Sequence, residues 1–82
     1  MTIAPLTCKS PTLDVILAAK RDGRRWLRIN PDTPPRPTEA AETGAVELLR
    51  IFREHDVSLN TRTHLIDLYI EIFTTSATKA TQ

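Results

Sequence analysis

The spacing of apolar residues predicts a first helix near the start of the chain. Three apolar residues recur at i, i+3 and i+4 and so share one helix face: Leu13, Ile16 and Leu17. Ser10 and Pro11 precede them and suit an N-cap and a first helical position, because serine accepts a free N–H and proline has none to leave unpaired. Gly23 is typical of a helix end, so we expect a helix over about residues 11–22.

A second helix is predicted after the proline-rich segment. Thr38 is a candidate N-cap, and Gly44 lowers helix stability by about 1 kcal/mol relative to alanine, so the robust part runs from Ala45 to His55. Its apolar stripe consists of Ala45, Leu48, Leu49 and Phe52, widened by Val46 and Ile51. Its charged side consists of Glu47, Arg50, Arg53 and Glu54. Arg50 and Glu54 have the i, i+4 spacing of an ion pair.

Residues 64–74 fit both a helix and a strand. In a helix, a narrow polar line interrupts an apolar surface: His64, Asp67 and Glu71. In a strand, four apolar residues occupy one face: Ile66, Leu68, Ile70 and Ile72. The β-branched and aromatic content favours a strand. The cap signals at Ser58 or Asn60 and the length of the segment favour a third helix. Both readings stay open at this point.

Residues 24–29 alternate in a way that predicts a short extended segment. Arg24, Trp26 and Arg28 would then lie on one side. Residues 31–37 contain four prolines, which predicts a stiff connector. The expected fold class is mainly α, a small three-helix domain with one short extended segment. The alternative is a small α/β unit with strands near 24–29 and 64–74 around a crossover helix.

A chain of 82 residues predicts one domain with a small core. We expect a flexible arm over residues 1–9, a domain over residues 10–76 and a flexible tail over residues 77–82. Dimerisation commonly compensates for a small core. A homodimer seam is therefore expected on the apolar segment, built from Ile66, Tyr69, Ile70 and Phe73.

The charge and cysteine content limit the class of protein. The net charge is +1 and there is one cysteine, so no disulfide forms within a chain and a cytoplasmic location is favoured. The N-terminal residues do not resemble a signal peptide. The longest apolar-rich run, residues 65–73, contains Asp67 and Glu71 and is too short to cross a bilayer. We expect no membrane association.

The most specific chemical feature is a dense group of cations around the only tryptophan. Five cations fall within nine residues, which suits binding to an anionic surface. The predicted partner-binding residues are Lys20, Arg21, Arg24, Arg25, Trp26 and Arg28. Arginine and tryptophan are enriched where interfaces concentrate their binding energy, so an acidic protein surface is the leading partner. The alternative for Trp26 is a place in the core.

Residues 45–73 also permit a helix-turn-helix reading. The start of its second helix would face DNA through Asn60, Arg62 and Thr63. The two histidines, His55 and His64, match no zinc spacing, and no catalytic or cofactor motif is present. The prediction is a small non-enzymatic adaptor or inhibitor, of the kind that phages and plasmids encode, without cofactor or metal. The alternative is a DNA-binding regulator.

Overall fold

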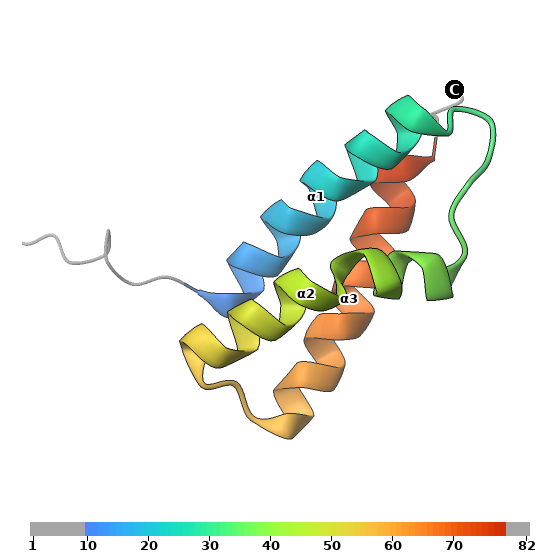
Figure 1. Cartoon of the computed structure of the whole chain (residues 1–82). Helices are drawn as coiled ribbons and strands as arrows, with labels where there is room; N and C mark the ends of the chain where they lie inside the picture. Colours follow the sequence, from blue (N-terminus) through green and yellow to red (C-terminus); the bar gives the residue numbers. More distant parts are fainter. Residues whose placement is uncertain (1–9, 79–82) are drawn as a thin grey trace, which may run out of the picture.

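The computed structural model describes residues 10–78, which form three helices of 19 residues each (Figure 1). These are α1 (Pro11–Ile29), α2 (Pro37–His55) and α3 (Leu59–Ala77). The mainly α prediction is confirmed, and residues 64–74 are helical. The described residues contain no strand, so the extended segment at 24–29 and the α/β alternative are wrong. The predicted arm, residues 1–9, and most of the predicted tail, residues 79–82, lie outside the described residues.

Helix α1 begins as predicted but is seven residues longer than expected. The Ser10 hydroxyl accepts a hydrogen bond from the backbone N–H of Leu13 at 3.3 Å. Gly23 does not end the helix, and its φ is not positive. It is buried against α3, where an added Cβ would lie 2.6 Å from the Ser76 Cβ and 2.7 Å from the Phe73 carbonyl oxygen. Gly23 therefore allows α1 and α3 to approach closely.

This close approach determines which face of α1 is buried. The residues of α1 that face the core are small: Val15, Ala18, Ala19 and Gly23. Leu13 and Leu17, predicted to form the apolar face, are instead 51% and 56% exposed. The prediction was wrong because the contact between α1 and α3, the most extensive in the fold, selects small side chains.

Helix α2 begins two residues before the predicted start. Arg36, not Thr38, is the N-cap, and Pro37 is the first helical residue, where its missing N–H costs nothing. The Glu39 carboxylate accepts a hydrogen bond from the backbone N–H of Arg36 at 2.8 Å. The helix ends at Asp56, which adopts the left-handed conformation with φ 51°. This conformation turns the chain into α3 within three residues.

Helix α3 starts after Ser58, one of the two predicted caps. The Ser58 hydroxyl accepts a hydrogen bond from the backbone N–H of Thr61 at 3.4 Å. The helix extends to Ala77, which is 1% exposed. The folded part therefore passes the predicted boundary at residue 76, because Ala77 packs into the core.

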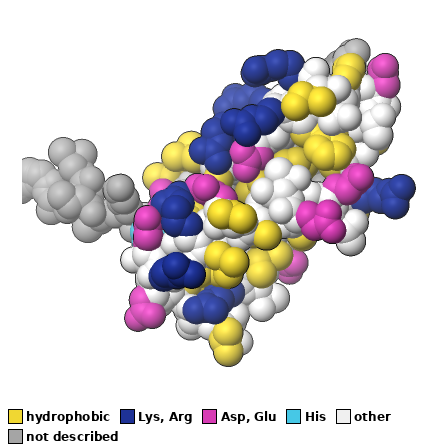
Figure 2. Space-filling model, in the orientation of Figure 1, with side chains coloured by type: hydrophobic (Ala, Val, Ile, Leu, Met, Phe, Trp, Pro, Cys, Tyr) yellow, Lys and Arg dark blue, Asp and Glu magenta, His cyan; other side chains and the backbone are white. Residues whose placement is uncertain are grey.

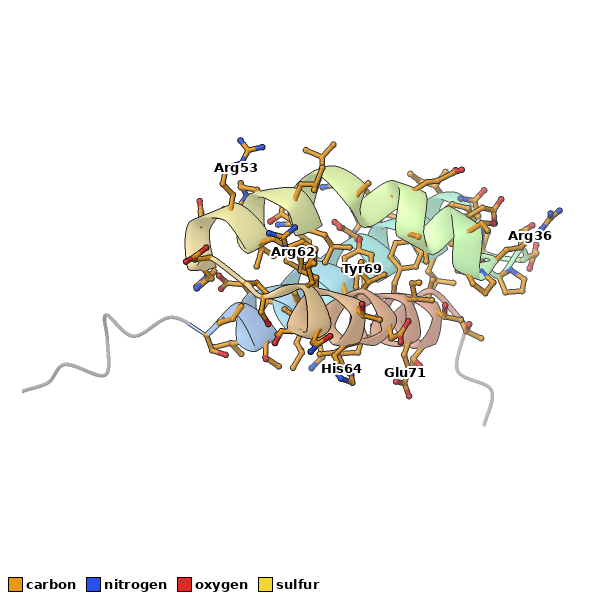
Figure 3. All side chains as sticks on the ribbon, turned by 90° about the horizontal axis from the view of Figure 1, so that it is seen from below. Arg36, Arg53, Arg62, His64, Tyr69 and Glu71 are labelled. Carbon is orange, nitrogen blue, oxygen red and sulfur yellow. The ribbon has the colours of Figure 1, made fainter. Side chains whose placement is uncertain are left out.

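The core lies between the three helices, and aromatic rings occupy its centre. Tyr69 and Phe73 are fully buried and stack with ring centroids 5.7 Å apart. Figure 3 shows Tyr69 pointing from α3 into the space between the helices. The buried apolar residues are Val15, Ala18, Ala19, Ala40, Leu48, Ile51, Phe52, Val57, Leu65, Tyr69, Phe73 and Ala77.

Polar contacts fix how the helices are aligned. The His55 Nε2 lies 2.9 Å from an Asp14 carboxylate oxygen, which joins the end of α2 to the start of α1. The Arg62 Nε donates to the Val57 carbonyl at 3.0 Å, and its guanidinium lies over the Phe52 ring, 5.6 Å from the centroid. Within residues 10–78, no helix is both long and apolar enough to span a membrane.

Candidate partner-binding surface

The five cations predicted to bind a partner all lie on α1 and are all exposed: Lys20, Arg21, Arg24, Arg25 and Arg28. We call them the basic face. A helix advances about 100° per residue, so Lys20, Arg24 and Arg28 follow one another along the side of α1 opposite its buried residues. Dark blue side chains gather along α1 in the space-filling view (Figure 2). The helical backbone thus concentrates cations that a strand would have divided between two faces.

Most of the basic face has no ionic partner among residues 10–78. Only Arg21 is paired, with its Nε 3.1 Å from an Asp22 carboxylate oxygen, and this hydrogen bond raises the pKa of the Arg21 guanidinium. By contrast, Arg50 on α2 bonds to both Glu47 and Glu54. The positive charge of α1 therefore remains largely uncompensated by the described part of the chain.

The nearest acid to the basic face, Asp22, is directed into the core. Asp22 is 8% exposed, and its carboxylate accepts a hydrogen bond from the Tyr69 hydroxyl at 2.6 Å. Burial, followed by this hydrogen bond, raises the pKa of Tyr69 well above its ordinary value of 10. A buried carboxylate is costly unless it is hydrogen-bonded. Asp22 thus serves the fold, and sequence analysis did not detect it because its partner lies 47 residues away.

Two leucines extend the same side of α1 toward its N-terminus. Leu13 and Leu17 are more than half exposed, and Leu17 precedes Lys20, Arg24 and Arg28 at steps of three and four residues. Residues at this spacing are neighbours on a helix surface. The outer side of α1 is therefore apolar in its first half and cationic in its second. The spacing of these residues was present in the sequence, but it was not recognised because the helix was predicted to end at Gly23, before Arg24 and Arg28.

Trp26 lies on the buried side of α1, away from the row formed by Lys20, Arg24 and Arg28. It is partly buried and packs edge-on against Phe73 with ring centroids 6.0 Å apart. Its indole N–H donates to the Thr33 carbonyl at 2.9 Å, which fastens the proline-rich link to α1. A hollow of about 180 Å³ beside the indole is lined partly by Arg25, Asn30 and Thr43. One edge of Trp26 therefore supports the core while another borders this hollow.

The residues predicted to read DNA do not form a matching cationic set. Asn60 and Thr63 are exposed in the first turns of α3. Arg62 is half-buried, bonded to the Val57 carbonyl and stacked on Phe52. Its guanidinium fixes the turn between α2 and α3 and would have to leave these contacts to reach a base.

Two of the four residues predicted to form a homodimer seam are buried in this fold. Tyr69 and Phe73 are fully buried against α1 and α2, so they cannot contact a second copy. Ile66 and Ile70 are half-buried. Tyr69 and Phe73 are buried because the core of a three-helix domain with few aromatic residues takes up the largest side chains of α3.

Within residues 10–78, no group of three or more His, Cys, Asp or Glu side chains is placed to hold a metal ion. Comparison with known proteins found no matching family model, no similar curated protein and no similar solved structure.

Proposed function

We propose that the protein is a small non-enzymatic adaptor or inhibitor whose basic face docks on an acidic protein surface in the cytoplasm. The observation that carries this proposal is the row of exposed cations on α1 without ionic partners among the described residues. Such a row raises the rate of encounter with an anionic partner and selects against cationic ones.

The leucines favour a protein over a nucleic acid as the partner. Leu13 and Leu17 continue the basic face with apolar area. A phosphate backbone has no apolar surface against which these side chains could be buried. A protein surface with an acidic patch beside an apolar hollow complements both halves of α1. The low net charge of +1 also does not favour a protein that coats nucleic acid without selectivity.

The test compares two variants with the same change of charge. In the first, Arg24→Glu reverses a cation at the centre of the basic face. In the second, Arg36→Glu reverses an exposed arginine outside α1. Each is immobilised beside the unaltered chain, and proteins bound from an extract of the native host are compared. We expect a captured protein to be retained by the second variant and lost from the first, and to be weakened by Leu17→Ser.

A duplex DNA oligonucleotide provides the competing outcome. If all five cations of the basic face contacted phosphates, log K would fall with log salt concentration at a slope of about −4 to −5. Such a slope, abolished by the α1 reversal, would replace the acidic protein with DNA as the partner. Equal loss of capture from both charge variants would refute a dedicated role of α1.

A further inference from the structure

The outer face of α2 carries apolar side chains that the described residues leave uncovered. Val46 is 80% exposed and Leu49 is 57% exposed. A groove of about 260 Å³ between α2 and α3 is lined by Ala41, Ala45, Leu48, Leu49, Phe52 and Ile66. On the other side of Leu49 lies a shallow hollow of about 460 Å³, lined by Val46, Leu49, Arg50, Arg53 and Glu54. Leu49 therefore stands as a ridge between two depressions.

Opposite charges mark the two ends of this face. Glu42 and Arg53 are exposed and eleven residues apart, which is about three helical turns and about 16 Å along the axis. Eleven residues rotate by only about 20° beyond whole turns, so both lie on the side of Val46 and Leu49. Neither has an ion-pair partner among residues 10–78. Figure 3 shows Arg53 pointing away from the other helices.

We propose that a second copy of this chain covers the outer face of α2, with the two α2 helices antiparallel about a two-fold axis. An axis between residues 47 and 48 places Glu42 opposite the partner's Arg53, and Arg53 opposite the partner's Glu42. The same axis places Val46 opposite the partner's Leu49, and Leu49 opposite the partner's Val46. One register thus matches both the charged pair and the apolar pair named here, as an isologous interface requires.

The charge pattern is what identifies the occupant. In an antiparallel pair of α2 helices, both ends of the seam bring together opposite charges, whereas a parallel pair would bring together like charges. In the middle, each Leu49 ridge meets the hollow beside Val46 of the other copy. Ala45, exposed beside these residues, leaves room for two helices to approach.

The seam differs from the homodimer surface predicted from sequence and is independent of the proposed function. It uses α2, so the basic face on α1 stays available in both copies. One helix from each copy forms an interface below about 1,200 Å², the size class of weak and transient complexes. We therefore expect a dimer that dissociates on dilution.

Sedimentation of charge-reversed variants tests the register directly. Glu42→Arg alone, or Arg53→Glu alone, places like charges at both ends of the seam. We expect each to raise the dimer dissociation constant at least about tenfold, as two lost ion pairs and two repulsions imply. Mixing the two variants should restore dimers, because one end then joins the two reversed charges and the other end joins the two original charges, and both pairs are of opposite sign. The doubly reversed chain should also dimerise.

Two further variants separate a seam on α2 from general effects of charge. Glu71→Arg makes the same charge change as Glu42→Arg, but Glu71 lies on the side of α3 that points away from α2 (Figure 3). We expect it to dimerise normally. Val46→Asp should abolish dimers, and circular dichroism confirms that each variant is folded. Unaltered protein that stays monomeric up to about 1 mM, a range that includes the weak complexes of this size class, would overturn the proposal. So would a mixture of the two single variants that stays monomeric.

Discussion

Replacing Gly44 with alanine distinguishes helix propensity from packing. Gly44 lies in the interior of α2, where glycine is less favourable than alanine by about 1 kcal/mol, so propensity alone predicts that Gly44→Ala stabilises the protein. In the structure, Gly44 is buried against the Tyr69 ring, and an added Cβ would lie 2.8 Å from the Tyr69 hydroxyl oxygen and closer still to two ring carbons. The packing therefore predicts the opposite sign.

The size of the loss in unfolding free energy follows from two features of Tyr69 that the added Cβ would disturb: the packing of its ring and its hydrogen bond to Asp22. Its ring is fully buried and stacked on Phe73, so no free space receives it. Overpacking a core costs about 1–3 kcal/mol. Moving the hydroxyl away from Asp22 weakens a buried hydrogen bond to a charged group, worth about 1.5–3 kcal/mol. After the gain in helix propensity, the free energy of unfolding should fall by about 3 kcal/mol.

Urea unfolding followed by far-UV circular dichroism measures this loss. With a slope of about 1 kcal/mol per M for a domain of this size, the midpoint should fall by roughly 2–3 M. The control is Ala45→Gly, one residue further on and exposed, which should lose only the propensity difference of about 1 kcal/mol. A Gly44→Ala protein as stable as the unaltered chain, or more stable, would refute the packing argument.

Three further predictions concern stability. Tyr69→Phe leaves the buried Asp22 carboxylate without its 2.6 Å hydrogen bond and should lower the free energy of unfolding by about 1.5–3 kcal/mol, measured by urea unfolding. Because folding raises the pKa of Tyr69 above 10, the Tyr69 hydroxyl ionises first in the unfolded chain, and the free energy of unfolding should decline above about pH 10. The decline should be less steep in Tyr69→Phe. An equal decline in both proteins would contradict the pKa shift. Ser58→Ala removes the cap of α3 and should cost about 1 kcal/mol, whereas Ser58→Asp, which keeps an acceptor, should cost little in the same thermal melt.

The parts of the fold that sequence analysis predicted correctly depend on neighbours in the chain. Ser10 was predicted as a cap, and Ser58 as one of two candidates with Asn60, because a cap acts on an N–H three residues away. Gly23 was misread because a glycine that ends a helix and one that admits another helix look alike locally. The residues that distinguish them, Phe73 and Ser76, are about fifty positions later.

The candidate site was also predicted only in part, because its composition is local but its arrangement depends on distant residues. The cations of α1 stood out by composition alone, and the structure exposes all five. Their arrangement was predicted wrongly, since an extended backbone placed Trp26 beside Arg24 and Arg28. In the helix, Trp26 turns toward Phe73, and Lys20 and Arg28 are the neighbours of Arg24 one turn away on either side. No local sequence pattern indicated the hydrogen bond between Tyr69 and Asp22, which are 47 residues apart.

The position of Trp26 gives this molecule a built-in optical reporter. It is the only tryptophan in the chain, so all indole emission comes from one ring between Phe73 and the Thr33 carbonyl. Unfolding exposes that ring to water and moves its emission to longer wavelength. The wavelength of that emission therefore reports the folded state of the chain without an added label.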